Sequence, residues 1–309
     1  MKILRLQSIG VAGVPDGSYD FAKSPEEAHD LVVVTGDEGA GKTRFLELVT
    51  AARELIAPSG LEMDEETWVR VGNRSAKAVV VWQLSKEERA SIGAKSPIVE
   101  TEVIFCADSE LTARDRTDPG FIYLLERYDH KDEISKLEYF PENRRLDVGG
   151  GEVSLEAEVQ KALRGDKSPR KYASVPAFLA TLPNAQHSAD RFAASLERLS
   201  ESCRYDRDRH TLSSNGRSVR DVTELSSSEQ DAVIFAATAG LVRLTRSVVL
   251  VDRPELYASD PERMLGGLRG LGADNQLIVA TCAPELAVSA PDRCIIRLPA
   301  AQLPRKDAR

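Results

Sequence analysis

The sequence predicts an α/β fold organised around a phosphate-binding loop, and three adjoining stretches carry this prediction. Gly36-Asp37-Glu38-Gly39-Ala40-Gly41-Lys42-Thr43 has the pattern G-x-x-x-x-G-K-T. The run Leu31 to Val34 before it is apolar and β-branched, which is typical of a buried parallel strand. The segment Arg44 to Ala52 after it places apolar residues on one face of a helix. Strand, loop and helix in this order are the context that a P-loop requires.

The chemistry expected of this loop follows from its residue types. Glycines allow a turn that a residue with a Cβ could not make so tightly, so that backbone N–H groups and a helix N-terminus meet at one point. Lys42 is then expected to reach the β- and γ-phosphates of a nucleotide, and the Thr43 hydroxyl to ligate Mg²⁺.

Composition is that of a soluble globular protein. The 309 residues are 42% hydrophobic and 29% charged, enough for one large domain or two ordinary ones. We find no run of about eighteen apolar residues and no signal peptide, so we expect a cytoplasmic protein without a membrane partner. A net charge of −8 argues against a surface that is basic throughout, but leaves room for a local nucleic-acid groove. The four cysteines lack metal-site spacing and are expected to be reduced packing residues.

The N-terminal third reads as strands flanking the P-loop unit. The helix after the loop is expected to end before Pro58-Ser59-Gly60. Alternation and turn residues predict two strands joined by a turn at the chain start, and an antiparallel lobe inserted after that helix. The predicted strands are Lys2–Ile9, Ser18–Phe21, Trp68–Val71 and Ala78–Leu84 (the last two as a hairpin), Ile98–Phe105 and Ser135–Phe140.

The middle of the chain changes character. Helical spacing predicts helices at Val153–Leu163 and Ala185–Ser202. The polar connector that begins with Arg164–Lys171 lies between them, and we interpret it as a solvated loop in preference to a phosphate contact.

The last third contains a second motif. Ser226, Ser227 and Ser228 open a predicted helix that runs to about Arg246, either as simple caps or as a second phosphate contact. The apolar run Ser247 to Asp252 follows, and it has the form of a Walker B strand, whose Asp holds Mg²⁺. Further strands are predicted at Gln276–Thr281 and Ile295–Leu298.

Together these motifs resemble the ABC-type ATPases, specifically the SMC/RecF/OLD-like branch of AAA family ATPases found in DNA repair and bacterial defence. Leu225-Ser226-Ser227-Ser228-Glu229-Gln230 resembles the signature L-S-S-G-E-Q, and Val251-Asp252-Arg253-Pro254-Glu255-Leu256 resembles I-D-E-P-E-L. Asn275 to Leu286 resembles N-Q-x-I-V-x-T-H-S-P-E-L, and Tyr139 to Arg145 is similar to a stretch of small members. The resemblance implies a P-loop NTPase head with an antiparallel β-lobe and a helical lobe, binding ATP and Mg²⁺.

The resemblance also implies a division of the chain. Residues 1–309 would form a single ABC-type ATPase domain. Residues 1–150 would supply the ATP-binding core and the antiparallel lobe, residues 151–246 the helical lobe and signature, and residues 247–309 the Walker B strand and the C-terminal strands.

Three positions depart from the family pattern. Arg253 stands where the family has the Glu that polarises the attacking water, Cys282 replaces the switch His that senses the γ-phosphate, and Ser228 replaces the signature Gly. A guanidinium cannot act as general base, and a thiol is a poor phosphate ligand. Lys42, Thr43 and Asp252 are intact, so the binding half of the site is kept. Gln83 and Asn143 are the candidates for the family's Q-loop glutamine.

The implied function is an ATP-binding switch with weak ATPase activity. Two heads, as a homodimer or higher homo-oligomer, would sandwich ATP, with Ser226 of one chain facing the phosphate bound by Lys42 of the other. A separate effector protein would do the downstream work, in DNA repair or anti-phage defence. Two alternatives stay open: a competent DNA-stimulated ATPase in which Glu255 replaces the missing base, and a scaffold in which ATP is structural.

Overall fold

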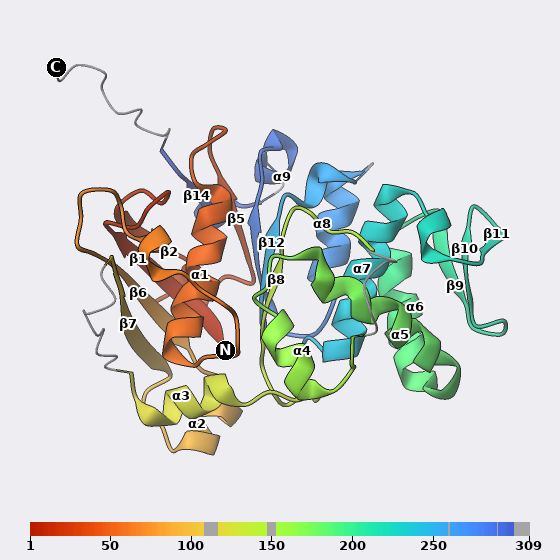
Figure 1. Cartoon of the computed structure of the whole chain (residues 1–309), viewed down its shortest axis with the longest axis horizontal. Coiled ribbons are helices and arrows are strands. Elements are labelled where there is room, and N and C mark those ends of the chain that lie inside the picture. The colour runs from red at the N-terminus through yellow and green to blue at the C-terminus, as the bar shows by residue number, and fades with distance from the viewer. Residues whose placement is uncertain (108–116, 147–152, 259, 289, 300–309) are drawn as a thin grey trace.

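A five-stranded parallel sheet forms the centre of the molecule (Figure 1). The computed structural model describes residues 1–107, 117–146, 153–258, 260–288 and 290–299. All neighbouring strands of this sheet are parallel, in the order β14-β5-β13-β12-β8, which confirms the predicted α/β class. The strands are β5 (Leu31–Thr35), β8 (Leu137–Phe140), β12 (Val248–Asp252), β13 (Gln276–Ala280) and β14 (Ile295–Arg297).

An antiparallel sheet of order β2-β1-β6-β7 packs on one side of this layer. Helix α1 (Lys42–Ile56) lies between the two sheets (Figure 1), where Phe45, Leu48 and Val49 are fully buried, because its apolar residues recur at helical spacing. The antiparallel strands are β1 (Lys2–Ile9), β2 (Gly17–Asp20), β6 (Ser75–Gln83) and β7 (Ile98–Cys106). Smaller elements here are β3 (Ala22–Ser24), β4 (Glu27–Ala28), α2 (Lys86–Ile92) and α3 (Pro119–Glu126).

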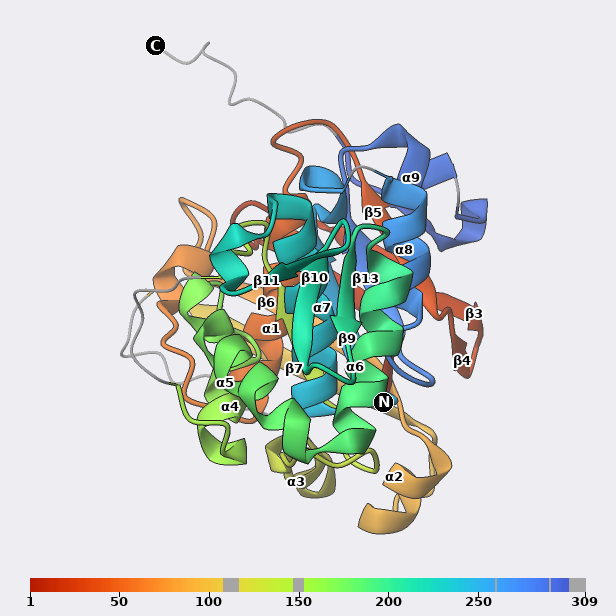
Figure 2. The same ribbon diagram turned by 90° about the vertical axis from the view of Figure 1, so that its right-hand side faces the viewer.

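Helices cover the other side of the parallel sheet. They are α5 (Ser174–Thr181), α6 (Gln186–Leu199), α7 (Ser227–Val242), α8 (Pro261–Arg269) and the short α9 (Pro284–Val288). Helix α4 (Ala157–Leu163) lies close to α1 instead, where Lys161 lines a small pocket together with Thr50 and Arg53. A small antiparallel sheet beyond α6 was not predicted from the sequence; Figure 2 shows it facing the viewer. Its strands are β9 (Cys203–Asp206), β10 (Thr211–Ser214) and β11 (Arg217–Val219).

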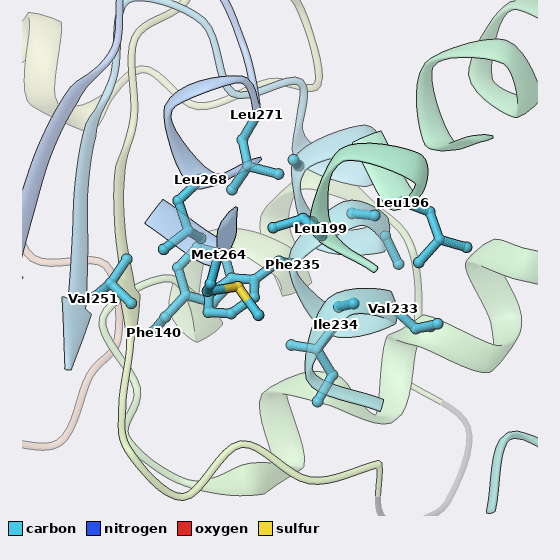
Figure 3. Close-up of a cluster of buried hydrophobic side chains, with 14 of the residues drawn as sticks. Phe140, Leu196, Leu199, Val233, Ile234, Phe235, Val251, Met264, Leu268 and Leu271 are labelled. Atoms are coloured by element: carbon cyan, nitrogen blue, oxygen red, sulfur yellow. The ribbon is translucent and has the colours of Figure 1, made fainter. Parts of the chain in front are cut away.

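Helix α7 is the centre of the second core. It is apolar nearly all round, as expected of a helix that is covered on every side. In Figure 3, Phe140 of β8 and Val251 of β12 lie on the sheet side of this core, which also contains Phe235 of α7 and Met264 of α8. The ring centroids of Phe140 and Phe235 are 4.7 Å apart. The end of β8 is therefore packed directly on α7.

Two strand predictions were wrong. Glu65–Trp68 forms a 3₁₀ turn, and Val69 makes only an isolated bridge to Val11, so no hairpin joins this segment to β6. The Trp68 ring stacks instead on Phe105, with 5.4 Å between ring centroids, and this burial outweighs the local β propensity. The strand predicted at Ser135–Phe140 exists as β8, but it pairs with β12 in the parallel sheet and is not part of the antiparallel lobe.

The connector after α4 was also misjudged. Arg164 and Lys171 are only 5% and 1% exposed, because both pair with Glu138 of β8, at 3.0 and 2.9 Å. A buried carboxylate needs such partners, and two cations from the connector supply them. Helix α4 starts at Ala157, later than the predicted Val153, while α6 and α7 end at Leu199 and Val242, before the predicted ends.

None of the helices among the described residues is both long and apolar enough to cross a membrane.

Candidate functional site

The carboxyl ends of the parallel strands bring the sequence motifs to one edge of the sheet. Val34 of β5 pairs with Ala280 of β13, which in turn pairs with Asp252 at the end of β12. Phe140, the last residue of β8, pairs with Val251. The P-loop, Arg253, Cys282 and the loop that begins at Pro141 therefore leave the sheet side by side, as is usual for ligand sites in open α/β sheets.

The backbone of the P-loop can be built only with glycine at two positions. Gly41 has φ 91°, and a Cβ there would lie 2.0 Å from the carbonyl oxygen of Gly13. Gly36 has φ 153°, and its Cβ would lie 2.8 Å from the carbonyl oxygen of Leu298. Both contacts are shorter than atoms can approach, so the loop is held between two backbone segments that leave no room for side chains.

The predicted phosphate-binding residues take the following places in the loop. The Lys42 side chain folds back so that Nζ donates to the carbonyl oxygens of Gly36 and Asp37, both at 2.8 Å. Ala40 is buried, and its N–H donates to Asp37 O at 3.1 Å. Asp37, Glu38, Gly39 and Thr43 face solvent. The loop thus encloses one buried ammonium beside an exposed hydroxyl.

Asp252 is buried at the edge of this loop, with 1% of its surface exposed. Among the described residues, neither carboxylate oxygen has a hydrogen-bond partner. Burial raises the pKa of Asp252 to about 6. The Thr43 hydroxyl, which is close to the carboxyl but not placed for an ordinary hydrogen bond, lowers this pKa. The negative charge of Glu142 raises it further. An unpartnered buried carboxylate is costly, and a cation at this place would offset that cost.

Arg253, Glu255 and Cys282 gather beside Asp252. Arg253 has φ 47°, and its guanidinium pairs with Glu142 at 3.2 Å. Burial works to lower the pKa of Arg253, but Glu142, aided by Cys282 and Glu255, raises it. The Glu255 Oε1 accepts a hydrogen bond from the Cys282 N–H at 3.0 Å, while its buried Oε2 has no partner in the described part of the chain.

Ser226 and Ser228 lie at the start of α7. Ser226 is the N-cap, and it forms a capping box with Glu229, whose carboxylate also accepts hydrogen bonds from Ser202 and Ser214, both at 2.7 Å. No hydrogen bond or ion pair joins either signature serine to the P-loop within the part of the chain that the structure describes. Within one chain the structure therefore brings together the P-loop, Asp252, Arg253, Glu255 and Cys282, but not Ser226 and Ser228.

Sequence reasoning missed two residues of the loop after β8. Glu142 is the partner of Arg253, and the fully buried Arg144 side chain pairs with Asp231 of α7. An Asp in an otherwise apolar helix was the available signal, because such a carboxylate needs a cationic partner. Of the two Q-loop candidates, Gln83 accepts a hydrogen bond from the Ala28 N–H in the antiparallel lobe, while Asn143 lies in the loop after β8.

Comparisons with known proteins bear on the fold. No family model matches the sequence, and neither does any curated protein. Among solved structures, an SMC head bound to the C-winged helix domain of ScpA matches with a TM-score of 0.61 at 10% identity, covering 94% of this chain and 93% of that one. The recombination mediator RecF with ATP matches at 0.49, with 8% identity over 91% and 92% of the two chains. A bacterial Atm1-family ABC exporter with ATP matches at 0.41 and 12% identity, over 96% of this chain and 37% of that one. The likeness to the SMC head shows that this chain has the same α/β fold as that head.

Proposed function

We propose that this chain is an ATP-binding head of the SMC/RecF/OLD-like branch, which holds Mg-ATP at the P-loop edge and hydrolyses it slowly. The observation that carries the proposal is the buried carboxylate of Asp252 beside Thr43, which has no hydrogen-bond partner among the described residues. Mg²⁺ prefers hard oxygen ligands of this kind, together with phosphate oxygens and water. When bound, the ion would neutralise charge on the phosphates, and Asp252 and Thr43 are the residues that would hold it.

The P-loop supplies the other half of the proposed site. The loop backbone and the N-terminus of α1 favour negative charge at this position. Lys42 donates to two loop carbonyl groups, and it would exchange these acceptors for phosphate oxygens. A charged acceptor makes the stronger hydrogen bond, so this exchange favours binding.

Slow turnover follows from the residues beside Asp252. Arg253 occupies the place of the family's general base, and its guanidinium stays protonated at any working pH. Its Nε has no partner among the described residues, so it could instead stabilise charge on the γ-phosphate or anchor a second head. Loss of a general base costs roughly 10²–10⁴ in rate.

One observation favours the alternative of a competent ATPase. Glu255 presents a buried Oε2 that has no partner in the described chain, and it is held in place through Oε1 by the Cys282 N–H. A carboxylate in this position is suited to accept a proton from water. DNA stimulation of turnover would support this alternative, whereas nucleotide that survives purification without turnover would support a scaffold role.

The proposed assembly is two chains around each nucleotide. Each chain has one P-loop and one signature, and the exposed Ser226 is not joined to its own P-loop. Residues 1–309 would then act as a single head, with a separate effector or DNA as further partners.

Thermal unfolding with and without Mg-ATP tests nucleotide binding. We expect Mg-ATP at 100 times its Kd to stabilise the wild type by about 2.7 kcal/mol. Lys42→Ala should abolish this, and Asp252→Asn should remove the part that depends on Mg²⁺. Lys77→Ala is the matched control, because Lys77 pairs with Glu102 on the exposed face of the antiparallel sheet. An unchanged ATP shift in Lys42→Ala would refute the proposal.

Light scattering with saturating Mg-ATP tests the assembly. The wild type should dimerise, and Ser226→Arg should stay monomeric because a bulky cation would occupy the interface. A wild type that binds ATP but stays monomeric, alone and with its native partners, would contradict the two-head arrangement.

A further inference from the structure

Arg144 uses every hydrogen-bond donor of its guanidinium. Nε and Nη2 donate to the two carboxylate oxygens of Asp231, a residue of α7. Nη1 donates to the carbonyl oxygens of Pro141 and Asp252, at 2.6 and 2.7 Å, and Nη2 also donates to the Arg253 carbonyl oxygen at 3.1 Å. A guanidinium has five N–H groups, and all five have acceptors here.

The surroundings of Arg144 leave it no freedom. Both Arg144 and Asp231 have fully buried side chains, and the Arg144 guanidinium carbon lies 5.0 Å from the centre of the Phe235 ring, one turn further along α7. Burial raises the pKa of Asp231 despite the opposing attraction of Arg144, whereas the attraction of Asp231 outweighs burial at Arg144 and raises the pKa of the guanidinium. With two parallel hydrogen bonds between them, the two groups form an ionised pair.

These contacts connect the nucleotide side of the proposed site, at the end of β12, with the signature serines at the start of α7. One side of the guanidinium is fixed to the backbone of Asp252 and Arg253. The other is fixed to Asp231, which lies five residues after the N-cap Ser226. A shift at the end of β12 must therefore move the start of α7, or break some of the hydrogen bonds of a buried guanidinium.

We propose that Arg144 is a positioning residue that couples nucleotide binding at Asp252 to the orientation of Ser226, through its ion pair with Asp231. This inference rests on the proposed function. Coupling between two sites requires a structural element whose arrangement both sites influence. The Arg144–Asp231 pair is in contact with the nucleotide site at Asp252 and with the helix that carries Ser226.

Two substitutions test the coupling. Arg144→Lys keeps the charge but lacks the five-donor fork, and Asp231→Asn keeps the shape but removes the ionic attraction. Arg164→Lys is the matched control: Arg164 is also a buried arginine in an ion pair, but its three side-chain hydrogen bonds go to Gln160 of α4 and Glu138 of β8, and none of the three goes to β12 or α7.

Nucleotide binding is measured separately from its proposed effects on residues 226–231 and on association. We expect both variants still to bind Mg-ATP in a Lys42-dependent way, because neither substitution changes the P-loop or the side chains of Thr43 and Asp252. In the wild type, Mg-ATP should slow amide hydrogen exchange of residues 226–231 at protein concentrations where the chain is monomeric. In both variants this slowing should be lost, and ATP-dependent association should weaken by about 5- to 150-fold, the usual range of coupling between sites. Arg164→Lys should keep both.

Two results would overturn the inference. One is that Arg144→Lys and Asp231→Asn bind ATP, and that ATP then slows their amide exchange and promotes their association as much as in the wild type. The other, which decides the matter if neither variant folds, is a wild type that binds Mg-ATP in a Lys42-dependent way with no change of exchange at residues 226–231. A wild type that binds no ATP instead refutes the proposed function.

Discussion

The two sides of the candidate site differ in how they are built. On the P-loop side the backbone fixes the geometry: a Cβ at Gly36 or Gly41 would collide with a neighbouring carbonyl oxygen, and Asp252 is buried at the end of a central strand. On the other side, partly or fully exposed side chains from loops are held by single contacts, such as the pair of Arg253 with Glu142. Changes on the first side disturb the fold, whereas residues on the second can be exchanged without such a penalty. A chain can therefore keep the features of binding while those of hydrolysis change.

The strongest test of this difference restores the family's hydrolytic residues. The double substitution Arg253→Glu with Cys282→His should raise single-turnover hydrolysis by about 10²–10⁴, the usual contribution of general-base catalysis. Wild-type turnover should be far below the median of about 10 s⁻¹ for enzymes. Single-turnover hydrolysis of both proteins under the same conditions is the measurement.

Glu255→Gln is the control for that experiment. Fast wild-type hydrolysis that collapses in Glu255→Gln would show that a displaced carboxylate serves as the base, and the comparison between the two sides would then fail.

A second test compares two glycines of the P-loop. Gly41→Ala should cost about 2–4 kcal/mol, because an alanine at φ 91° is strained and its Cβ meets a backbone oxygen. Gly39→Ala should cost about 1 kcal/mol, since Gly39 has φ 77° but no atom within 4 Å of an added Cβ. Urea denaturation without nucleotide measures both. Equal costs would mean that close packing does not fix the loop.

Local pattern was enough to predict the frame of the molecule. The β-branched runs form β5, β12 and β13, and the helix after the P-loop is α1. These elements could be predicted because strand burial and helical spacing depend on residues that are close in the sequence. The structure also places Arg253, Glu255 and Cys282 together, because the adjacent parallel strands β12 and β13 end at the same edge of the sheet.

What could not be predicted depends on distant partners. Arg164 and Lys171 look like solvated residues until Glu138 is known to lie beneath them. Trp68 leaves its expected strand to stack on Phe105, 37 positions further along the chain. The role of Arg144 could not be predicted, because its ion-pair partner Asp231 is 87 residues away in the sequence. Local propensity cannot predict contacts between residues that are distant in the sequence.

The smallest expected effect on stability is that of replacing Arg253, and the second arginine beside Asp252, Arg144, provides the comparison. Arg253→Gln should change the free energy of unfolding by less than about 1 kcal/mol, because the Arg253 and Glu142 side chains are 40% and 49% exposed and water screens their attraction. Arg144→Gln should cost about 3–5 kcal/mol, because it leaves Asp231 as a buried charge without its partner. Urea denaturation of the two variants, with the same substitution in each, isolates the effect of burial. If Arg253→Gln proved as costly as Arg144→Gln, the exposed side of the site would be as rigidly held as the P-loop side, and Arg253 would be a structural residue whose replacement could not be read as a change in catalysis alone.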